Sequence, residues 1–272
     1  SMTNLVSSSG VVAADVTGVG TARNQLAAAS YGGDKAIFGY GYTGSRVSLT
    51  NLVNNSGVVA TDTTGVGTAR SGPAAATYGT DKAIFGYGND SSGYVSLTNL
   101  VSNSGVVATD VTGVGSARAW LAAAGYGTDT AIFGYGYNDS TYVSMTNLVN
   151  NSGVVAADVT GVGQVRYGLA AARYGGDKAI FGYGTGGYYS MTNLVTSSGV
   201  VGSDVTGVGT ARNNLAAASY GGDKAIFGYG NSSGGLVSVS NLVSSSGVVA
   251  TDVTGVGTAR KELAAAGYSI SA

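Results

Sequence analysis

The chain of 272 residues contains no cysteine, no histidine and only one proline. The absence of cysteine excludes disulfides and thiolate metal sites. The absence of histidine removes the commonest general base, the Ser-His and Cys-His nucleophile pairs, and the main ligand of zinc and copper sites. We therefore predict that the chain is not an enzyme and that it needs no metal and no cofactor.

Charge is also scarce. Only 10% of residues are charged, and the net charge is -1. No basic field can hold phosphates, so we expect neither nucleic acid nor a membrane surface as a partner. No apolar run approaches the ~20 residues of a membrane helix, and no signal-peptide pattern occurs in this sequence. With 44% hydrophobic residues, the composition predicts a soluble globular protein with a large core, expected to be a monomer.

A repeat of 46 to 48 residues fills the chain. The tripeptide Thr-Asn-Leu, or once Ser-Asn-Leu, begins at Thr3, Thr50, Thr98, Thr146, Thr192 and Ser240. A unit of this length cannot bury its own apolar face. The six copies are therefore expected to stack on one another or to close into a ring.

The second unit contains four short apolar runs, at residues 74–78, 83–87, 95–101 and 106–108. They are rich in Val, Ile, Phe, Tyr and Ala, and Gly, Ser, Asn and Asp turns separate them, which is typical of antiparallel strands. Glycine, with 47 residues in the chain, recurs too often for helices. The pattern predicts an all-β chain.

Six four-stranded units predict a six-bladed β-propeller of four-stranded antiparallel blades, a single domain over residues 1–272 with repeats of about 47 residues. An open solenoid is the main alternative. A solenoid would require atypical capping repeats with polar outer faces. The first and last units are as apolar as the others, which favours the ring.

The segments Ala69-Arg70, Ala74-Ala75-Ala76 and residues 81–86 (Asp-Lys-Ala-Ile-Phe-Gly) resemble a kelch repeat. The kelch pattern begins with an arginine, and the arginines at that position in this chain are Arg23, Arg70, Arg118, Arg166, Arg212 and Arg260. Two features depart from the family pattern: Gly-Tyr-Gly replaces its glycine pair, and its fourth-strand tryptophan is missing. The resemblance implies a propeller whose function is binding.

The order of the runs also predicts how the ring closes. The chain begins at a third strand (2–6) and ends after a first strand (263–266), so the N-terminal strands would complete the C-terminal blade. The second strand of the sixth unit should match residues 36–40, but only residues 268–272 remain. Either this stub is a shortened strand or the last blade is incomplete.

Two places vary among the copies. One is the loop after Gly-Tyr-Gly, at 42–46, 89–94, 137–142, 185–188 and 231–236, which contains all the variation in length. The other is the pair after the repeated arginine, at 24–25, 71–72, 119–120, 167–168, 213–214 and 261–262. In an up-and-down blade both segments lie at the same end, so we expect them on one face.

The variable segments and their neighbours contain the only Trp and seven of the 18 Tyr. Tyr, Ser, Gly and Asn on a rigid frame are typical of binding surfaces, and the predicted ligand is a carbohydrate or a protein surface. Unconstrained drift of the loops is the alternative. The predicted ligand-binding residues are Tyr42, Arg46, Asp90, Tyr94, Trp120, Tyr137, Asp139, Tyr142, Tyr167, Tyr188 and Tyr189.

An aspartate lies eight residues before each repeated arginine, at Asp15, Asp62, Asp110, Asp158, Asp204 and Asp252. Because the pair recurs in every unit, we interpret it as part of six structural hydrogen-bond networks. Asp90 and Asp139 lie in loops that lack the carboxylate density of a calcium site.

These observations predict a binding protein that presents variable loops on one face. The Gly/Ala/Thr-rich repeats also resemble repetitive virion fibre and microbial surface proteins, which implies a virion or extracellular location and a receptor-binding or adhesive role. The alternative is a symmetric scaffold with no ligand, either engineered or recently amplified.

Overall fold

The computed structural model describes residues 1–268, and every regular element within them is a β-strand. The all-β prediction is confirmed for this part of the chain. It also contains no helix long and apolar enough to cross a membrane.

Five three-stranded antiparallel sheets share one order, in which the middle strand pairs with both neighbours. The Ala-rich first strands are β3 (Ala27–Tyr31), β6 (Ala74–Tyr78), β11 (Ala122–Tyr126), β14 (Ala170–Tyr174) and β18 (Ala216–Tyr220). The middle strands are β4 (Lys35–Gly39), β7 (Lys82–Gly86), β12 (Thr130–Tyr137), β15 (Lys178–Gly182) and β19 (Lys224–Gly228). The third strands are β5 (Thr50–Val53), β10 (Thr98–Val101), β13 (Tyr142–Val149), β16 (Thr192–Val195) and β22 (Ser240–Val243).

Seven strands of two residues complete the set. Two belong to the N-terminal segment: β1 (Met2–Thr3) pairs with β2 (Val16–Thr17). The others lie in the variable segments: β8 (Asn89–Asp90) pairs with β9 (Gly93–Tyr94), and β20 (Asn231–Ser232) pairs with both β17 (Arg212–Asn213) and β21 (Gly235–Leu236).

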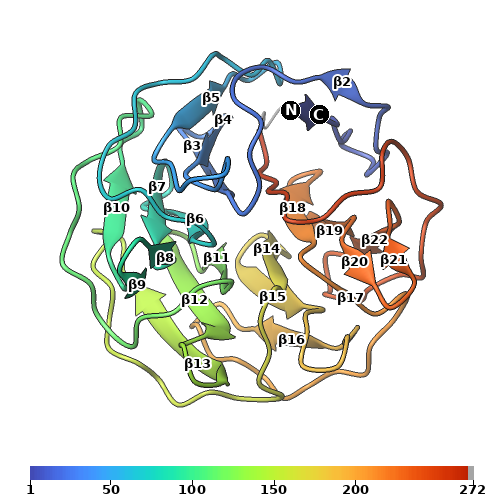
Figure 1. Cartoon of the computed structure of the whole chain (residues 1–272). Coiled ribbons are helices and arrows are strands. Elements are labelled where there is room, and N and C mark those ends of the chain that lie inside the picture. Colours follow the sequence, from blue (N-terminus) through green and yellow to red (C-terminus); the bar gives the residue numbers. More distant parts are fainter. Residues whose placement is uncertain (269–272) are drawn as a thin grey trace.

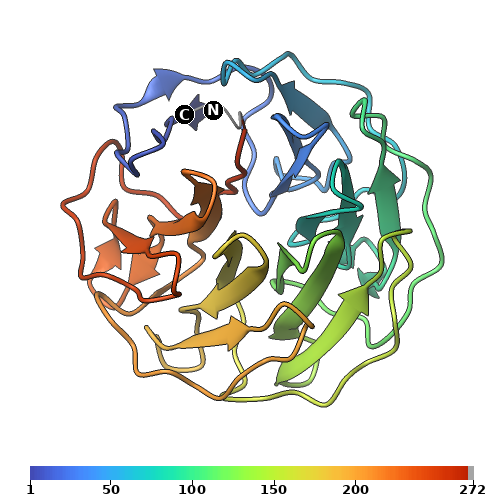
Figure 2. The ribbon, with the colours of Figure 1, turned by 180° about the vertical axis from the view of Figure 1, so that it is seen from behind.

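The sheets are arranged around a common centre, with the Ala-rich strands innermost and the third strands farther out (Figure 1). The view from behind shows the same arrangement (Figure 2). The remaining sector holds β1, β2 and the segment that follows residue 260, so the first and last repeats are neighbours.

The burial of each strand follows from its place in the sheet. In β6, buried and half-buried residues alternate, as in a strand with one face covered. In β7, Ala83, Ile84 and Phe85 are all fully buried, because neighbouring sheets cover both faces of a middle strand. This explains why the middle strand is a continuous apolar run and the first strand is not.

The predicted fourth strand, residues 106–108 in the second unit, does not form a regular strand and makes only isolated bridges. Residues 58–63 pair with β5 at only two bridges, Val53 with Val59 and Thr50 with Thr63. The outer segment has one more residue between the bridges than β5 has, as in a β-bulge. The Asn51 side chain bonds to the outer segment at this bulge. It donates to the Ala60 carbonyl (3.0 Å) and to the Asp62 carboxylate (2.8 Å). Each sheet therefore consists of three strands and a bulged outer segment.

Neighbouring sheets pack through one repeated aromatic contact. A middle-strand phenylalanine meets, edge to face, the Gly-Tyr-Gly tyrosine of the preceding sheet. The pairs are Tyr40–Phe85, Tyr87–Phe133, Tyr135–Phe181 and Tyr183–Phe227, with ring centroids 5.1 to 5.2 Å apart. Such contacts add stability beyond the burial of area alone.

A closed cycle of six backbone hydrogen bonds connects all six repeats. Each amide donates to the carbonyl of the equivalent residue in the preceding repeat, at 2.6 to 2.9 Å, and the first repeat donates to the last. The six residues have φ between 51° and 62°: Gln25, Gly72, Trp120, Gly168, Asn214 and Glu262. The left-handed conformation, unfavourable for residues other than glycine, turns each amide and carbonyl toward its neighbours.

An arginine connects each repeat to its surroundings, and it is fully buried in four of them, at Arg70, Arg118, Arg166 and Arg212. Arg118 illustrates the contacts. Its fully buried guanidinium donates to the carbonyls of Tyr135 (2.9 Å) and Ser116 (3.0 Å) and to the side chain of Asn147 (2.6 Å). It also lies 4.3 Å from the ring centroid of Tyr87 in the preceding sheet. Hydrogen bonds and an aromatic face together replace the water that burial removes.

The aspartate that pairs with each arginine comes from the following repeat. Arg118 lies 3.8 Å from Asp158, not beside Asp110, which precedes it by eight residues. Asp158 also accepts hydrogen bonds from Ser116 (2.7 Å) and Asn147 (2.9 Å). The interpretation of these residues as structural is supported, but each network joins two repeats instead of lying within one.

The same network joins the two ends of the chain. Arg260 donates to Asn4 and lies 3.5 Å from Asp15, which accepts a hydrogen bond from the Thr258 hydroxyl at 2.6 Å. The N-terminal segment therefore occupies the place that the next repeat has elsewhere. Residues 263–266, predicted as a strand, form none in the structure, and residues 269–272 of the predicted stub (268–272) lie outside the described residues.

We expect Arg118→Ala to lower the free energy of unfolding by about 3 kcal/mol, because it removes a buried cation and leaves several acceptors without a donor. Lys82→Ala removes the same charge from an exposed site, and its effect should stay within about 0.5 kcal/mol. Urea denaturation of the two variants measures both values. Equal losses of unfolding free energy in the two variants would show that the buried network adds no stability beyond that of an exposed charge.

The stability should depend on pH only at the extremes. Hydrogen bonds from Thr258 and Asn4 lower the pKa of Asp15 to about 2, and a hydrogen bond from Thr21 lowers the pKa of Asp62. Burial raises the pKa values of Tyr87, Tyr135 and Tyr183 to about 12. The carboxylates therefore stabilise the fold above their unfolded pKa of about 4, and the tyrosines stabilise it below theirs of about 10.

Unfolding free energies measured across pH should accordingly be level between about pH 5 and pH 9. They should fall as the pH drops from about 4 toward 2, and again as it rises from about 10 toward 12. A transition between pH 6 and 7 would contradict this assignment, since the chain has no histidine to produce one.

Candidate functional site

The two variable segments of each repeat lie next to each other. Bridges join the residue after the repeated arginine to the residue after Gly-Tyr-Gly, in the pairs Asn24–Tyr42, Ser71–Asn89, Ala119–Tyr137 and Tyr167–Thr185. In the fifth repeat β17 and β20 make the same contact. The prediction that both segments share one end of the sheets is confirmed.

Five of the predicted site residues form one aromatic cluster: Tyr94, Trp120, Tyr137, Tyr142 and Tyr167. Trp120 lies 6.0 Å from Tyr94 and 6.1 Å from Tyr167, between ring centroids. Tyr137 lies 5.7 Å from both Tyr94 and Tyr142, and the centroids of Tyr142 and Tyr167 are 4.8 Å apart. The rings come from three consecutive repeats, so the cluster exists only because these repeats are neighbours in the fold.

The backbone holds Trp120 in place. Its amide and its carbonyl both belong to the closed hydrogen-bond cycle, bonded to Gly72 (2.9 Å) and Gly168 (2.8 Å). The indole covers Gly72, where an added Cβ would lie 3.1 Å from the ring. Glycine at position 72 thus leaves the room that the Trp120 ring occupies.

The cluster is half-buried and uncharged. Burial, followed by the neighbouring tyrosine Tyr137, raises the pKa of Tyr94, and burial, followed by the neighbouring Tyr142, raises that of Tyr167. Tyr142 is the most exposed member, with 37% of its surface accessible. Phenol groups can donate and accept hydrogen bonds beside their apolar ring faces.

The other predicted residues lie outside the aromatic cluster. Tyr42 is exposed on the loop of the first sheet. The Arg46 guanidinium donates to the carbonyl (2.9 Å) and the side chain of Asn89 in the next loop. The Tyr188 hydroxyl accepts a hydrogen bond from Asn231 (3.0 Å), and Tyr189 follows it in the same loop. These contacts connect adjacent loops, and Tyr188 also lies near Tyr167 of the cluster.

The two loop carboxylates do not meet either. Asp90 accepts hydrogen bonds from the amides of Ser92 (2.6 Å) and Gly93 (3.1 Å) and so closes the turn between β8 and β9. Asp139 has a left-handed backbone, with φ of 76°, and its carbonyl accepts a hydrogen bond from Tyr137 (3.2 Å). Within residues 1–268, no group of three or more carboxylates is placed to hold a metal ion.

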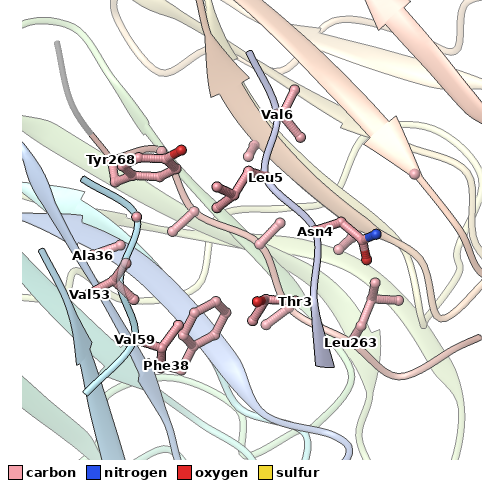
Figure 3. A pocket seen from close by; sticks show the side chains of 18 of the residues that line it. Thr3, Asn4, Leu5, Val6, Ala36, Phe38, Val53, Val59, Leu263 and Tyr268 are labelled. Carbon is pink, nitrogen blue, oxygen red and sulfur yellow. The ribbon is translucent and has the colours of Figure 1, made fainter. Parts of the chain in front are cut away.

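A second feature is a cavity of about 890 Å³ between the first and last repeats, in a different part of the molecule from the aromatic cluster (Figure 3). Its lining includes Leu5, Phe38, Gly228 and Leu263. The sequence carries a signal for it, because no sixth Ala-Ile-Phe-Gly-Tyr run follows residues 263–266. The missing run alone did not predict whether the first and last repeats would close the gap or leave a cavity between them.

Comparison with models of known protein families gives no match to this chain, and comparison with curated proteins gives none either.

Proposed function

We propose that the chain is a six-bladed, kelch-like β-propeller whose aromatic cluster binds carbohydrate without catalysing a reaction. Each repeat would form one blade, and the N-terminal strands would complete the last. The proposal for the fold rests on five sheets of one design and on the hydrogen-bond cycle that returns from the last repeat to the first. A virion or cell-surface location would suit such a binding protein.

The aromatic cluster is the observation that supports carbohydrate binding. Sugar rings present flat C–H faces that pack on aromatic rings, and hydroxyl groups that bond to phenols and loop amides. Trp120, Tyr137, Tyr142 and Tyr167 offer ring faces of this kind on a fixed backbone, which keeps the entropic cost of binding low. Serines and threonines in the adjacent loops, such as Ser92 and Thr141, are exposed and add hydroxyl groups.

The placement of the charged residues supports binding without catalysis. Cleavage of a glycoside generally requires two carboxyl groups on opposite sides of the bond. Asp90 and Asp139 lie in two loops that also carry rings of the aromatic cluster, and the carboxylate of Asp90 is engaged by the backbone of its own turn. Asp139 remains as a single carboxylate, not the pair that such cleavage requires.

A scaffold without a ligand is the second candidate. One observation favours it: the rings of the aromatic cluster contact one another, from 4.8 to 6.4 Å between centroids, so the cluster also packs three loops together. In that case substitutions in the cluster would change stability alone.

A glycan array followed by fluorescence titration distinguishes the two candidates. Trp120 is the only tryptophan, so a bound sugar should change the emission of the intact protein directly. Tyr142→Ala should weaken binding by at least about tenfold, the scale of an alanine substitution at an important contact. Trp120→Ala/Tyr142→Ala, followed by calorimetry, should abolish binding.

Tyr42→Ala is the matched control, because it removes an exposed tyrosine from the corresponding loop of another repeat. Its affinity should remain within about twofold of the unmodified protein, and thermal denaturation should show all three variants folded. Binding to no glycan would refute the carbohydrate proposal. Equal losses from Tyr42→Ala and Tyr142→Ala would place the site elsewhere.

A further inference from the structure

The cavity between the first and last repeats has the position of a missing middle strand. Residues 3–6 and residues 263–268 border it (Figure 3). Gly228 and Tyr229 line it from the preceding sheet, and Phe38 lines it from the following one. Their equivalents in the other repeats are packed against a middle strand, so the walls of the cavity can be compared with complete sites in the same molecule.

The complete sheets define the register of such a strand. In the second sheet, Phe85 of β7 lies opposite Ala75 on one side and Asn99 on the other. The corresponding residues beside the cavity are Ala265 and Asn4. No strand in the described part of the chain pairs with either. The cavity is therefore bordered by two segments, residues 3–6 and 263–266, that no middle strand joins within residues 1–268.

One wall has room for a phenylalanine ring. A Cβ added at the glycine that ends a middle strand would lie 2.6 to 2.8 Å from the phenylalanine of the next sheet, at Gly39, Gly86, Gly134 and Gly182. At Gly228, the fifth of this series, it would meet no atom within 4 Å. The adjacent Tyr229 has no edge-to-face phenylalanine among the described residues, although Tyr40, Tyr87, Tyr135 and Tyr183 all do.

One arginine beside the cavity lacks the backbone partner that its equivalents have. The carbonyl of Arg70 accepts the Gly41 amide (3.0 Å), whereas that of Arg23 accepts no backbone amide within residues 1–268. Arg23 lines the cavity, where a middle strand would supply the amide.

We propose that this cavity binds an extended peptide with the middle-strand sequence of the repeats, Asp-Lys-Ala-Ile-Phe-Gly-Tyr-Gly. The phenylalanine of the peptide would pack on Gly228 and on the ring of Tyr229. The Gly-Tyr pair of the peptide would pack against Phe38. Backbone hydrogen bonds to residues 3–6 and 264–267 provide affinity, and the side-chain positions provide specificity, as in strand addition generally. The inference does not depend on the aromatic cluster.

The run Ala-Ile-Phe-Gly-Tyr occurs five times in this sequence, and each copy contributes to the middle strand of a three-stranded sheet. A second copy of the chain is a poor donor. Its own middle strands are buried, with Ile84 and Phe85 fully inaccessible, and releasing one would open another gap.

A labelled synthetic peptide with the sequence of residues 81–88 tests the proposal by fluorescence anisotropy. The intact protein should bind it saturably, and its melting temperature should rise with peptide concentration. A peptide in which Ala replaces the phenylalanine should bind at least about tenfold more weakly. A scrambled peptide of the same composition should not bind.

Gly228→Ala is the decisive protein variant. The added methyl group has space in the free protein, and the backbone there is not left-handed, so the melting temperature should not change. The methyl would collide with the peptide phenylalanine, so affinity should fall at least about tenfold. In this variant, the difference in affinity between the peptide with phenylalanine and the peptide with alanine should also become smaller. Gly234→Ala, in a loop away from the cavity, should leave binding unchanged.

Several results would overturn the proposal. These are no binding by a folded monomer, equal binding of the scrambled peptide, or unchanged affinity in Gly228→Ala. Sedimentation that shows a dimer dissociated by Gly228→Ala would assign the cavity to a second copy instead.

Discussion

The buried arginine network is the interaction on which the rest of the structure depends. A fully buried guanidinium is tolerable only when most of its donors find acceptors, and no single repeat provides all of its contacts. Arg118 uses two carbonyls and an asparagine of its own sheet, the ring of Tyr87 from the sheet before, and Asp158 from the segment after. Each repeat is thus complete only between two neighbours. This requirement brings Asn4 and Asp15 beside Arg260 at the junction of the two chain ends.

Much of the architecture could be predicted from local patterns. Glycine-bounded apolar runs identified the first and middle strands, and comparison of the copies located both variable segments at one end. The outer strand was overestimated, because its bulge depends on the Asn51 side chain, which reaches Asp62 eleven residues later. The partner of Arg118 was not predictable from spacing, since Asp158 lies forty residues away and meets it only after two repeats pack together.

The candidate site illustrates the same limit. Sequence comparison singled out eleven loop residues, but only the packing of three repeats brings Tyr94, Trp120, Tyr137, Tyr142 and Tyr167 into contact. The position of Trp120 depends on a cycle that passes through all six repeats, and a local pattern could not show it. The cavity arises instead from an element that is missing between two repeats. Where one middle strand is missing among the described residues, Gly228 meets no phenylalanine and the Arg23 carbonyl accepts no backbone amide.

Closure of the ring is the central claim, and amide hydrogen exchange measured by NMR tests it most directly. The Gln25 amide donates to the Glu262 carbonyl, the single bond of the cycle that joins the first repeat to the last. We predict that the Gln25 amide exchanges about as slowly as those of Gly72 and Gly168, which hold equivalent places between adjacent repeats. Rapid exchange at Gln25 with slow exchange at Gly72 and Gly168 would show that the repeats form an open stack, and would contradict the account.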